Sequence, residues 1–299
     1  MSEIAARCPL CGSDRTKLYL DGEDSQLESA AVGSSRSQVS PGRVLRCRAC
    51  TFGFREMRPS EEELTNLYRR LDVKVYESEL AGRERTAKRH FGIVKKFVNS
   101  GAILDIGCAS GLLLKLASDD GWRVYGVEPS EHLYQHAREL LSGRGEILCT
   151  TLQNAALPQH FFDAVTFWDV LEHVPDPNSF MQLCTSLLKP GGHLFLNVPD
   201  IESLPARVLR SRWPLLLPEH LNYFTKRSLQ LCAGRAHLQL QRLGRRPASF
   251  SVNYILYRLA QHQIPAANWF HHLSLSHPFG NFIVPITLGE LYGVWKVPP

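Results

Sequence analysis

The residues whose types and spacing most clearly suggest chemistry form the run Leu-Asp-Ile-Gly-Cys-Ala-Ser-Gly at 104–111, followed by Glu128 at the end of a second apolar segment. The run predicts a strand that enters a tight turn, where Gly107 and Gly111 let a ligand approach the backbone closely. A carboxylate such as Glu128, at the end of the next strand, can accept hydrogen bonds from both hydroxyls of a ribose. The pattern therefore predicts a nucleoside-binding site.

The spacing of this turn differs from that of two other glycine-rich sites. A P-loop requires Gly-Lys-Ser/Thr and a dinucleotide fingerprint requires Gly-x-Gly-x-x-Gly, and neither pattern occurs between residues 104 and 111. Asp105 also lies inside the turn, where a carboxylate would repel a pyrophosphate but would suit a ligand that carries an amino group and a sulfonium. An ordinary turn between a strand and a helix, without a ligand, is the alternative.

The first motif resembles that of class I S-adenosylmethionine-dependent methyltransferases. The resemblance continues through Val-Glu-Pro-Ser at 127–130, through residues 162–177 and through Leu-Lys-Pro-Gly-Gly at 188–192. One departure is Ala109, where many members carry a third glycine. The resemblance implies S-adenosylmethionine as the methyl donor. It also implies a set of cofactor-binding residues, which are Asp105, Gly107, Gly111, Glu128, Leu152, Gln153, Trp168 and Asp169.

The elements that would position these residues follow from the alternation of apolar segments with amphipathic ones. Strands are predicted at 102–106, 123–127, 146–149, 162–168, 192–198, 237–243 and near 286–296, and helices at 83–98, 112–118, 131–141, 177–188 and 252–262. Strands that alternate with helices indicate a parallel sheet covered on both faces. We therefore expect an α/β fold with a Rossmann-like, doubly wound, seven-stranded sheet. Such a sheet binds ligands beyond the carboxyl ends of its strands, where the predicted residues would meet.

The domain organisation is interpreted as three consecutive parts. We expect a zinc-ribbon-like module at 1–57, a helical linker at 58–82 and a methyltransferase domain at 83–299, with insertions at 200–218 and 244–285. The longer insertion separates the last two predicted strands and is expected to shape the substrate pocket.

The two insertions are the least regular parts of the sequence. The shorter one carries Trp213 and the run Leu215–Leu217, for which burial, a lid over the substrate and a membrane-facing patch are the alternatives. Residues 263–280, in the longer one, show neither a helical nor a strand period.

Two C-x-x-C pairs near the N-terminus, Cys8 with Cys11 and Cys47 with Cys50, predict a metal site. Each pair can place two thiolates on one tight turn, and two pairs complete a tetrahedral four-sulfur zinc site. Because four protein ligands close the site, we expect zinc to have a structural role. A redox role is the alternative, although neither pair has the βαβ pattern typical of redox motifs around it. The remaining cysteines lie in apolar segments and are expected to be small core residues. They are Cys108, Cys149, Cys184 and Cys232.

Two histidines are candidates for a catalytic base. Methyl transfer from a sulfonium is a one-step displacement, in which alignment of donor and acceptor can supply about 7–11 kcal/mol of the barrier. An acceptor hydroxyl also needs to lose a proton, and His173 and His220 are placed to take it. Packing without a catalytic role is the alternative for each histidine.

The sequence also contains a candidate site for a divalent cation. Asp169, Glu172 and His173 would share one face of a helix at spacings of three and four, and together they could hold such a cation. Ubiquinone-type O-methyltransferases have a similar run. Capping and packing of the helix is the alternative reading of these residues.

Composition and charge restrict the class of protein. The 299 residues are 44% hydrophobic and 21% charged, which is typical of a soluble globular protein. Neither a signal-like N-terminal run nor an apolar stretch of about 18 residues occurs, so a cytoplasmic location is expected. The net charge is +5, and residues 201–299 contain 11 Lys and Arg against 3 Asp and Glu. This asymmetry favours an anionic partner, with a solvated basic face as the alternative.

The function expected from all of this is S-adenosylmethionine-dependent methylation, on oxygen, of a small molecule or a glycan precursor. The alternatives are an RNA methyltransferase, a catalytically inactive binding protein, and an enzyme for a lipid-linked or quinone substrate with peripheral membrane contact. RNA is less expected because the basic residues form no dense patch with interleaved aromatic residues. The sequence specifies neither the acceptor nor the oligomeric state.

Overall fold

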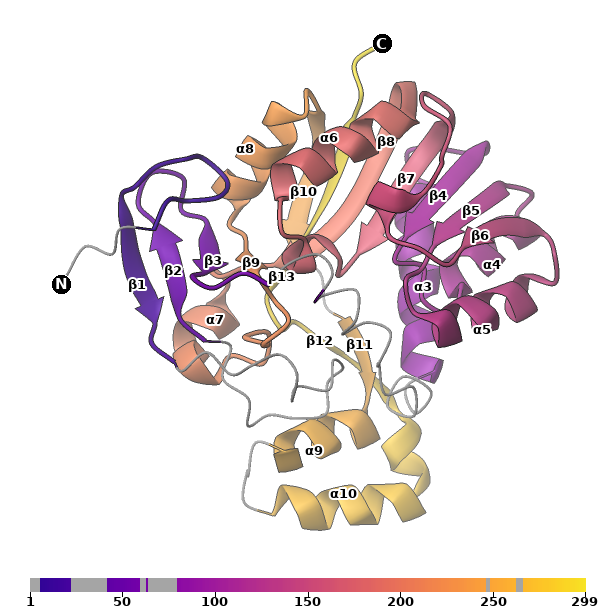
Figure 1. The fold of residues 1–299 in the computed structure, drawn as a ribbon. Coiled ribbons are helices and arrows are strands. Elements are labelled where there is room, and N and C mark those ends of the chain that lie inside the picture. Colours follow the sequence, from indigo (N-terminus) through magenta and orange to yellow (C-terminus); the bar gives the residue numbers. More distant parts are fainter. Residues whose placement is uncertain (1–5, 23–41, 60–62, 64–79, 246–247, 262–265) are drawn as a thin grey trace.

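The chain folds around a central β-sheet (Figure 1). The computed structural model describes residues 6–22, 42–59, 63, 80–245, 248–261 and 266–299. Within these residues, seven strands form one sheet in the order β10-β13-β8-β7-β4-β5-β6. They are β4 (Ala102–Ile106), β5 (Arg123–Val127), β6 (Gly145–Leu148), β7 (Phe162–Trp168), β8 (Leu188–Pro199), β10 (Gln239–Arg245) and β13 (Glu290–Lys296). Strands β4 to β8 are parallel, whereas β13 and β10 are antiparallel to their neighbours. The predicted α/β class and its mostly parallel sheet are confirmed.

Helices cover both faces of this sheet and bury an apolar side against it. The helices are α3 (Leu80–Val94), α4 (Leu112–Asp119), α5 (Glu131–Leu141), α6 (Pro177–Leu187) and α8 (Lys226–Arg235). The first three contribute to one hydrophobic core and the last two to another, on the opposite face. Local chemistry sets where the helices begin: Ser130 accepts a hydrogen bond from the backbone of Leu133, and Thr225 forms a capping box with Ser228.

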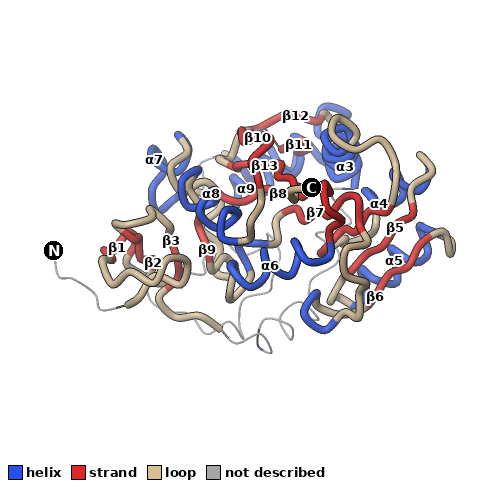
Figure 2. The backbone as a smooth tube through the Cα atoms, turned by 90° about the horizontal axis from the view of Figure 1, so that it is seen from above, coloured by secondary structure: helices blue, strands red, loops and turns tan. Residues whose placement is uncertain are grey.

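A second, smaller sheet joins the N-terminal cysteine region to the rest of the chain. In the described residues it contains β1 (Thr16–Leu20), β2 (Val44–Cys47), β3 (Gly53–Arg55) and β9 (Asn222–Tyr223), in that order and all antiparallel. Both views place β3 beside β9, although the two strands are far apart in the sequence (Figures 1 and 2). The side chains of Leu10, Phe52 and Phe54 belong to the same hydrophobic core as α6 and α8.

The segment between β10 and β13 forms a separate lobe below the sheet in Figure 1. It contains β11 (Ala248–Ser251), α9 (Val252–Gln261), α10 (Ala267–Ser276), η5 (Pro278–Asn281) and β12 (Ile283–Ile286), with β11 paired to β12. The helix expected at 252–262 is confirmed. Helix α10 lies where no period was predicted, because its apolar residues Trp269, Phe270 and Leu275 are exposed rather than gathered on a buried face.

The shorter insertion is packed against the domain. It contains α7 (Leu204–Leu209) and the single turn η4 (Arg210–Arg212). Trp213 and Leu216 are buried, and Trp213 Nε1 donates to the carbonyl of Leu288 at 2.7 Å. Burial is therefore the alternative that holds for Trp213 and Leu216, whereas Leu215 and Leu217 are half-buried.

The linker and any membrane-spanning helix remain to be considered. Most of the helical linker expected at 58–82 lies outside the described residues. None of the described helices is long and apolar enough to cross a membrane.

Candidate functional site

The glycine turn after β4 has the backbone that a close ligand approach requires. Gly107, Ala109 and Gly111 have φ angles of 70°, 48° and 79°. A Cβ at Gly107 would lie 2.8 Å from Val170 Cγ2. At Gly111 the crowding comes from α5, because a Cβ there would lie 3.1 Å from that of Ala137. Gly111 is thus required by helix packing and its own φ, and Ala109 adopts the left-handed conformation without being glycine.

Glu128 joins the ends of the first two strands. Its Oε2 accepts a hydrogen bond from the amide of Ala109 at 2.9 Å, and its Oε1 accepts one from the amide of Ser130 at 2.9 Å. The side chain is almost fully buried, and this burial raises the pKa of Glu128 to about 7. Each carboxylate oxygen keeps one lone pair for a further donor.

Asp105 is a second buried carboxyl at the same edge of the sheet. Its Oδ1 accepts a hydrogen bond from the hydroxyl of Thr166 on β7 at 2.5 Å. Burial raises the pKa of Asp105 to about 7, with the Thr166 hydrogen bond acting in the opposite direction. Two buried carboxyls whose pKa values lie near neutrality are typical of a functional site.

Two cavities open at the carboxyl ends of the parallel strands. One, which we call the Glu128 cavity, has a volume of about 310 Å³. The predicted residues that line it are Gly107, Glu128, Leu152, Gln153, Trp168, Asp169 and His173. The other, the Asp105 cavity, has a volume of about 240 Å³ and is lined by Asp105, Gly107, Trp168 and Asp169 among others. Of the predicted cofactor residues, Gly111 lines neither cavity.

Residues that the sequence did not indicate also line the Asp105 cavity. Asn197 on β8 exchanges two hydrogen bonds of 2.7 Å with Asp169, which has a φ of 56°. Glu290, at the start of β13, is close enough to Asp169 that burial and this second carboxylate raise its pKa to about 8. The ring of His90 stacks on Trp168 with centroids 3.7 Å apart. Of these residues, only Asn197 could have been noticed in the sequence, because it is a polar residue inside an apolar strand.

The indole of Trp168 lies where the two cavities meet. Its Nε1 is buried and, among the described residues, has no hydrogen-bond partner. An unpaired buried donor is costly, so its position at a cavity points to an acceptor on a ligand.

The two candidate bases lie in contact, but only one of them lines either of the two cavities described above. The rings of His173 and His220 are 4.7 Å apart and nearly perpendicular. Nδ1 of His173 donates to the carbonyl of Glu219 at 3.0 Å, and Nδ1 of His220 donates to that of Leu215 at 2.9 Å. Burial lowers the pKa of His173 to about 4, so it is neutral at pH 7. His173 lines the Glu128 cavity, whereas His220 is buried and lines neither.

The expectation that Asp169, Glu172 and His173 share one helical face is wrong. Residues 171–173 form a single 3₁₀ turn, η3, and Asp169 precedes it with a positive φ. The groups that converge are instead Glu172, His173 and His220, whose candidate ligand atoms lie within 4.8 Å of one another. Glu172 Oε2 is buried without a partner among the described residues, so a shared proton or a cation is what this cluster can accommodate.

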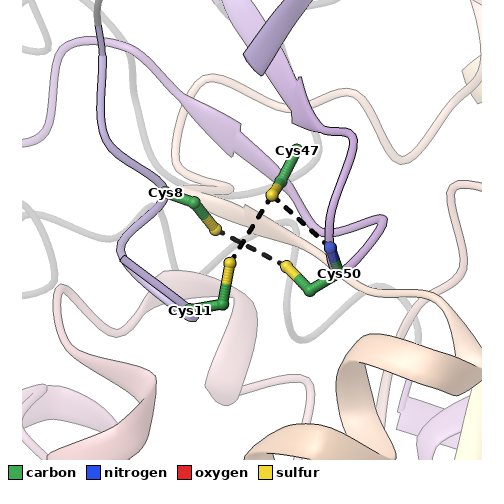
Figure 3. A group of neighbouring side chains, drawn as sticks. All are labelled: Cys8, Cys11, Cys47 and Cys50. Atoms are coloured by element: carbon green, nitrogen blue, oxygen red, sulfur yellow. Dashed lines mark hydrogen bonds between the residues drawn. The ribbon is translucent and has the colours of Figure 1, made fainter. Parts of the chain in front are cut away.

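The four N-terminal cysteines converge on one point (Figure 3). Cys8 Sγ lies 3.6 Å from Cys50 Sγ, and Cys11 Sγ lies 3.6 Å from Cys47 Sγ. Zinc–sulfur bonds of about 2.3 Å in a tetrahedron give sulfur–sulfur distances of roughly 3.8 Å. The two sulfur–sulfur distances and the convergence of all four sulfur atoms within 4.8 Å are compatible with a four-thiolate metal site. The fold separates the other cysteines from it, and of these Cys149 is exposed, contrary to expectation.

The class of protein follows from this geometry: an α/β protein with a nucleoside-type turn and a carboxylate at the carboxyl edge of a mostly parallel sheet. A family described as a methyltransferase domain matches residues 79–243, more than half of the chain. The chain therefore belongs to the class I methyltransferases.

Curated relatives align only with part of the chain. The ubiquinone biosynthesis O-methyltransferase of Vibrio cholerae serotype O1 is 39% identical over 99 residues, which cover 32% of this chain and 40% of the relative. The protein of the same name from Yersinia pestis (strain Pestoides F) is 40% identical over 101 residues, 32% of this chain and 41% of the relative. The chain thus spans about two fifths of the length of these relatives.

Solved structures share the fold at low sequence identity. The YcgJ protein of Bacillus subtilis has a TM-score of 0.53 and 14% identity, over 71% of this chain and 99% of its own. A SAM-dependent methyltransferase of Thermotoga maritima has a TM-score of 0.50 and 18% identity, over 76% of this chain and 96% of its own.

Proposed function

We propose that the protein transfers a methyl group from S-adenosylmethionine to an oxygen atom of a small molecule or a glycan precursor. The observation that carries the proposal is Glu128, held by the amides of Ala109 and Ser130 at the mouth of a cavity behind a glycine turn. The names of the partly aligned relatives support oxygen as the acceptor atom.

The residues present fit this cofactor. The two oxygens of Glu128 keep lone pairs for the ribose hydroxyls. Buried Leu152 offers an apolar contact for adenine, and Gln153 lies exposed beside it. Trp168 Nε1 can donate to an acceptor at the junction of the cavities, and Asp105 lines one of these two cavities. When bound, the cofactor supplies a methyl group already activated by its sulfonium.

We place the acceptor with its body in the Asp105 cavity and its hydroxyl at the junction with the Glu128 cavity, which His173 lines. Arg89 and His90 of α3 and Tyr254 of α9 line the Asp105 cavity, so it offers cationic and aromatic groups to a substrate. Because Asp105, Asp169 and Glu290 also line this cavity, the lining suits an aromatic hydroxyl compound whose anionic group, where it has one, lies beside Arg89. The test is to incubate the protein with methyl-labelled cofactor and cell extract separated into small-molecule, lipid, RNA and protein fractions. Label in the small-molecule fraction is expected, whereas label confined to RNA would contradict the proposal.

The proposed base is His173, with His220 positioning its ring. His173 is neutral and faces the Glu128 cavity, although a pKa of about 4 makes it a weak base. We expect His173→Gln to lower turnover at least about 100-fold while leaving cofactor affinity nearly unchanged. His220→Gln should have a smaller effect on turnover, because this ring touches His173 but lines neither the Glu128 cavity nor the Asp105 cavity. The rate of methyl transfer from labelled cofactor to cell extract measures turnover, and calorimetry with S-adenosylhomocysteine measures cofactor affinity. Normal turnover of both variants would exclude His173 as the base.

Cofactor affinity should depend on pH through Glu128. Burial raises its pKa to about 7, so below pH 7 the side chain is mostly protonated and one oxygen becomes a donor. A ligand whose hydroxyls need two acceptors must then displace a proton. The Kd for S-adenosylhomocysteine is expected to increase by up to about tenfold for each pH unit below 7 and to level off above it. Calorimetry between pH 5.5 and 8.5 tests this, and in Glu128→Gln the slope should flatten.

We also propose that Cys8, Cys11, Cys47 and Cys50 bind a structural zinc ion in a ribbon-like module at 1–57. The spacing of the four sulfur atoms supports this. Because all four positions of a tetrahedron would be taken by protein, the metal has no open site for chemistry. The division into a module, a linker and a methyltransferase domain with insertions at 200–218 and 244–285 is part of the same proposal. Limited proteolysis with mass determination of the fragments tests these boundaries. Cleavage inside residues 83–199 would contradict them.

A further inference from the structure

One wall of the Glu128 cavity is an irregular segment, residues 170–175. Val170, His173, Val174 and Pro175 from this segment line the cavity. Within the segment, His173 N donates to the carbonyl of Val170 at 3.0 Å, and Val174 N donates to that of Leu171 at 3.4 Å. A single 3₁₀ turn with bonds of this kind holds its shape poorly on its own. Its conformation therefore depends on what it packs against.

The neighbouring segment around β9 holds this wall from behind. The amide of Leu221 donates to the carbonyl of Glu172 at 2.7 Å. The side chain of Asn222 is completely buried, and its Nδ2 donates to the carbonyls of Leu171 at 2.9 Å and Val174 at 2.7 Å. These bonds fix both ends of the 3₁₀ turn.

Arg58, which follows β3 of the cysteine module, connects the two segments. Its guanidinium donates to the carbonyls of Pro175 at 2.6 Å, Val174 at 3.3 Å and Leu221 at 3.3 Å. It also donates to Oδ1 of Asn222 at 2.9 Å. One side chain thus satisfies acceptors on the cavity wall and on the segment behind it.

The charge and shape of Arg58 suit this position. Burial lowers its pKa to about 10, so the guanidinium is still cationic at neutral pH. Hydrogen bonds from a charged donor are about twice as strong as those between neutral groups. The planar guanidinium offers five donors in fixed directions, whereas the three donors of a lysine radiate from one nitrogen.

The cysteine module sets where Arg58 lies. Strand β3 begins three residues after Cys50 and pairs with β9. Thr51, next to the second cysteine pair, lies with its hydroxyl 2.6 Å from that of Thr225. Asn178 Nδ2 donates to the carbonyl of Leu10 in the first pair at 3.1 Å. The four-cysteine centre, Arg58 and the cavity wall therefore form one connected structure.

We infer that the four-cysteine module supports the cofactor cavity, with Arg58 as the positioning residue, so that loss of the module's metal weakens cofactor binding at a site the metal does not touch. The inference rests on the proposed zinc site and the proposed cofactor. It gives the module a role in the affinity of the enzyme for its donor, in addition to its own folding.

The first test measures S-adenosylhomocysteine binding by calorimetry in Arg58→Ala, with Arg48→Ala as the control. Arg48 belongs to the same module, and its side chain is exposed. We expect the Kd of Arg58→Ala to be about tenfold higher, within the usual range of coupling between sites, and that of Arg48→Ala to equal the wild-type value. In Arg58→Gly, added methylguanidinium should restore part of the affinity, which a general loss of folding would not allow.

The second test combines metal removal with the substitution. Chelation of the wild-type protein should raise the Kd by a similar factor, and chelation of Arg58→Ala should add little, because both changes act through one contact. Fully additive effects would overturn the inference, as would wild-type affinity in Arg58→Ala. Should the alanine variant fail to fold, Arg58→Lys decides in its place, and a wild-type Kd there would also overturn it.

The failure of this inference can be told apart from failure of the proposed function. A wild-type protein that binds no S-adenosylhomocysteine would refute the cofactor, and one purified without metal would refute the zinc site. Failure of the inference alone leaves a metal-containing protein whose cofactor affinity is indifferent to Arg58 and to the metal.

Discussion

Replacement of Glu128 by alanine should weaken the binding of S-adenosylhomocysteine about 100-fold. The carboxylate would accept two ribose hydroxyls in a cavity where water is largely excluded, and a hydrogen bond to a charged group contributes about 1.5–3 kcal/mol. Two such bonds, lost together, correspond to about 3 kcal/mol or more, which is roughly two orders of magnitude in Kd. Isothermal titration calorimetry at pH 8, where Glu128 is ionised, measures the change directly.

The same substitution also removes the acceptor of two backbone amides, so a control must separate binding from folding. Glu146→Ala is suitable, because Glu146 lies on the neighbouring strand β6 and is exposed. Thermal unfolding without ligand reports any damage to the turn, since Ala109 and Ser130 lose their partner. Unchanged affinity of Glu128→Ala would exclude the ribose assignment, whatever happens to stability.

The central sheet could be predicted from the sequence because each of its strands is marked by a short local run of residues. Strands β4, β5 and β7 begin and end at the predicted residues, 102–106, 123–127 and 162–168. Each is a short apolar run that a glycine or an acidic residue terminates, and each must be buried on both faces. The residues at the strand ends then come together because parallel strands place their carboxyl ends along one edge.

Contacts between distant segments account for what could not be predicted. Strand β9 is two residues long and exists only because β3 pairs with it. The spacing of Asp169, Glu172 and His173 suggested an α-helical face, but the Asn222 side chain binds carbonyls on either side of a 3₁₀ turn instead. Pairing and capping by a segment about 50 residues away leave no period in the local sequence.

For some single residues, the structure shows a role that differs from the one the sequence suggested. Gly111 belongs to the motif that indicated a ligand, yet α5 is what excludes a side chain there. Arg58 begins the predicted linker and Glu290 lies in the last predicted strand, but the significance of both depends on carbonyls and carboxylates from other elements. Motifs thus predict the proposed donor site, whereas the residues that support it are visible only in three dimensions.

Replacement of Cys47 by serine should abolish metal binding and destabilise the fold. A serine hydroxyl is a poor zinc ligand, and structural zinc contributes about 10–16 kcal/mol of apparent folding free energy in isolated zinc-finger peptides. We expect about one zinc ion per chain in the wild-type protein and none in Cys47→Ser, by elemental analysis. Cys149→Ser is the matched control, because Cys149 is exposed and lies outside the cluster.

The destabilisation should extend beyond the module because its core is shared. The side chains of Cys8, Cys47 and Phe52 belong to the hydrophobic core that contains α6 and α8. A loss of only about 3 kcal/mol would lower the Tm by roughly 6–12 °C in a domain of this size. If the module were independent, Cys47→Ser would instead unfold in two steps, the second at the wild-type temperature. Calorimetric unfolding distinguishes the two cases, and the shared core together with the β3–β9 pairing predicts a single, lowered transition.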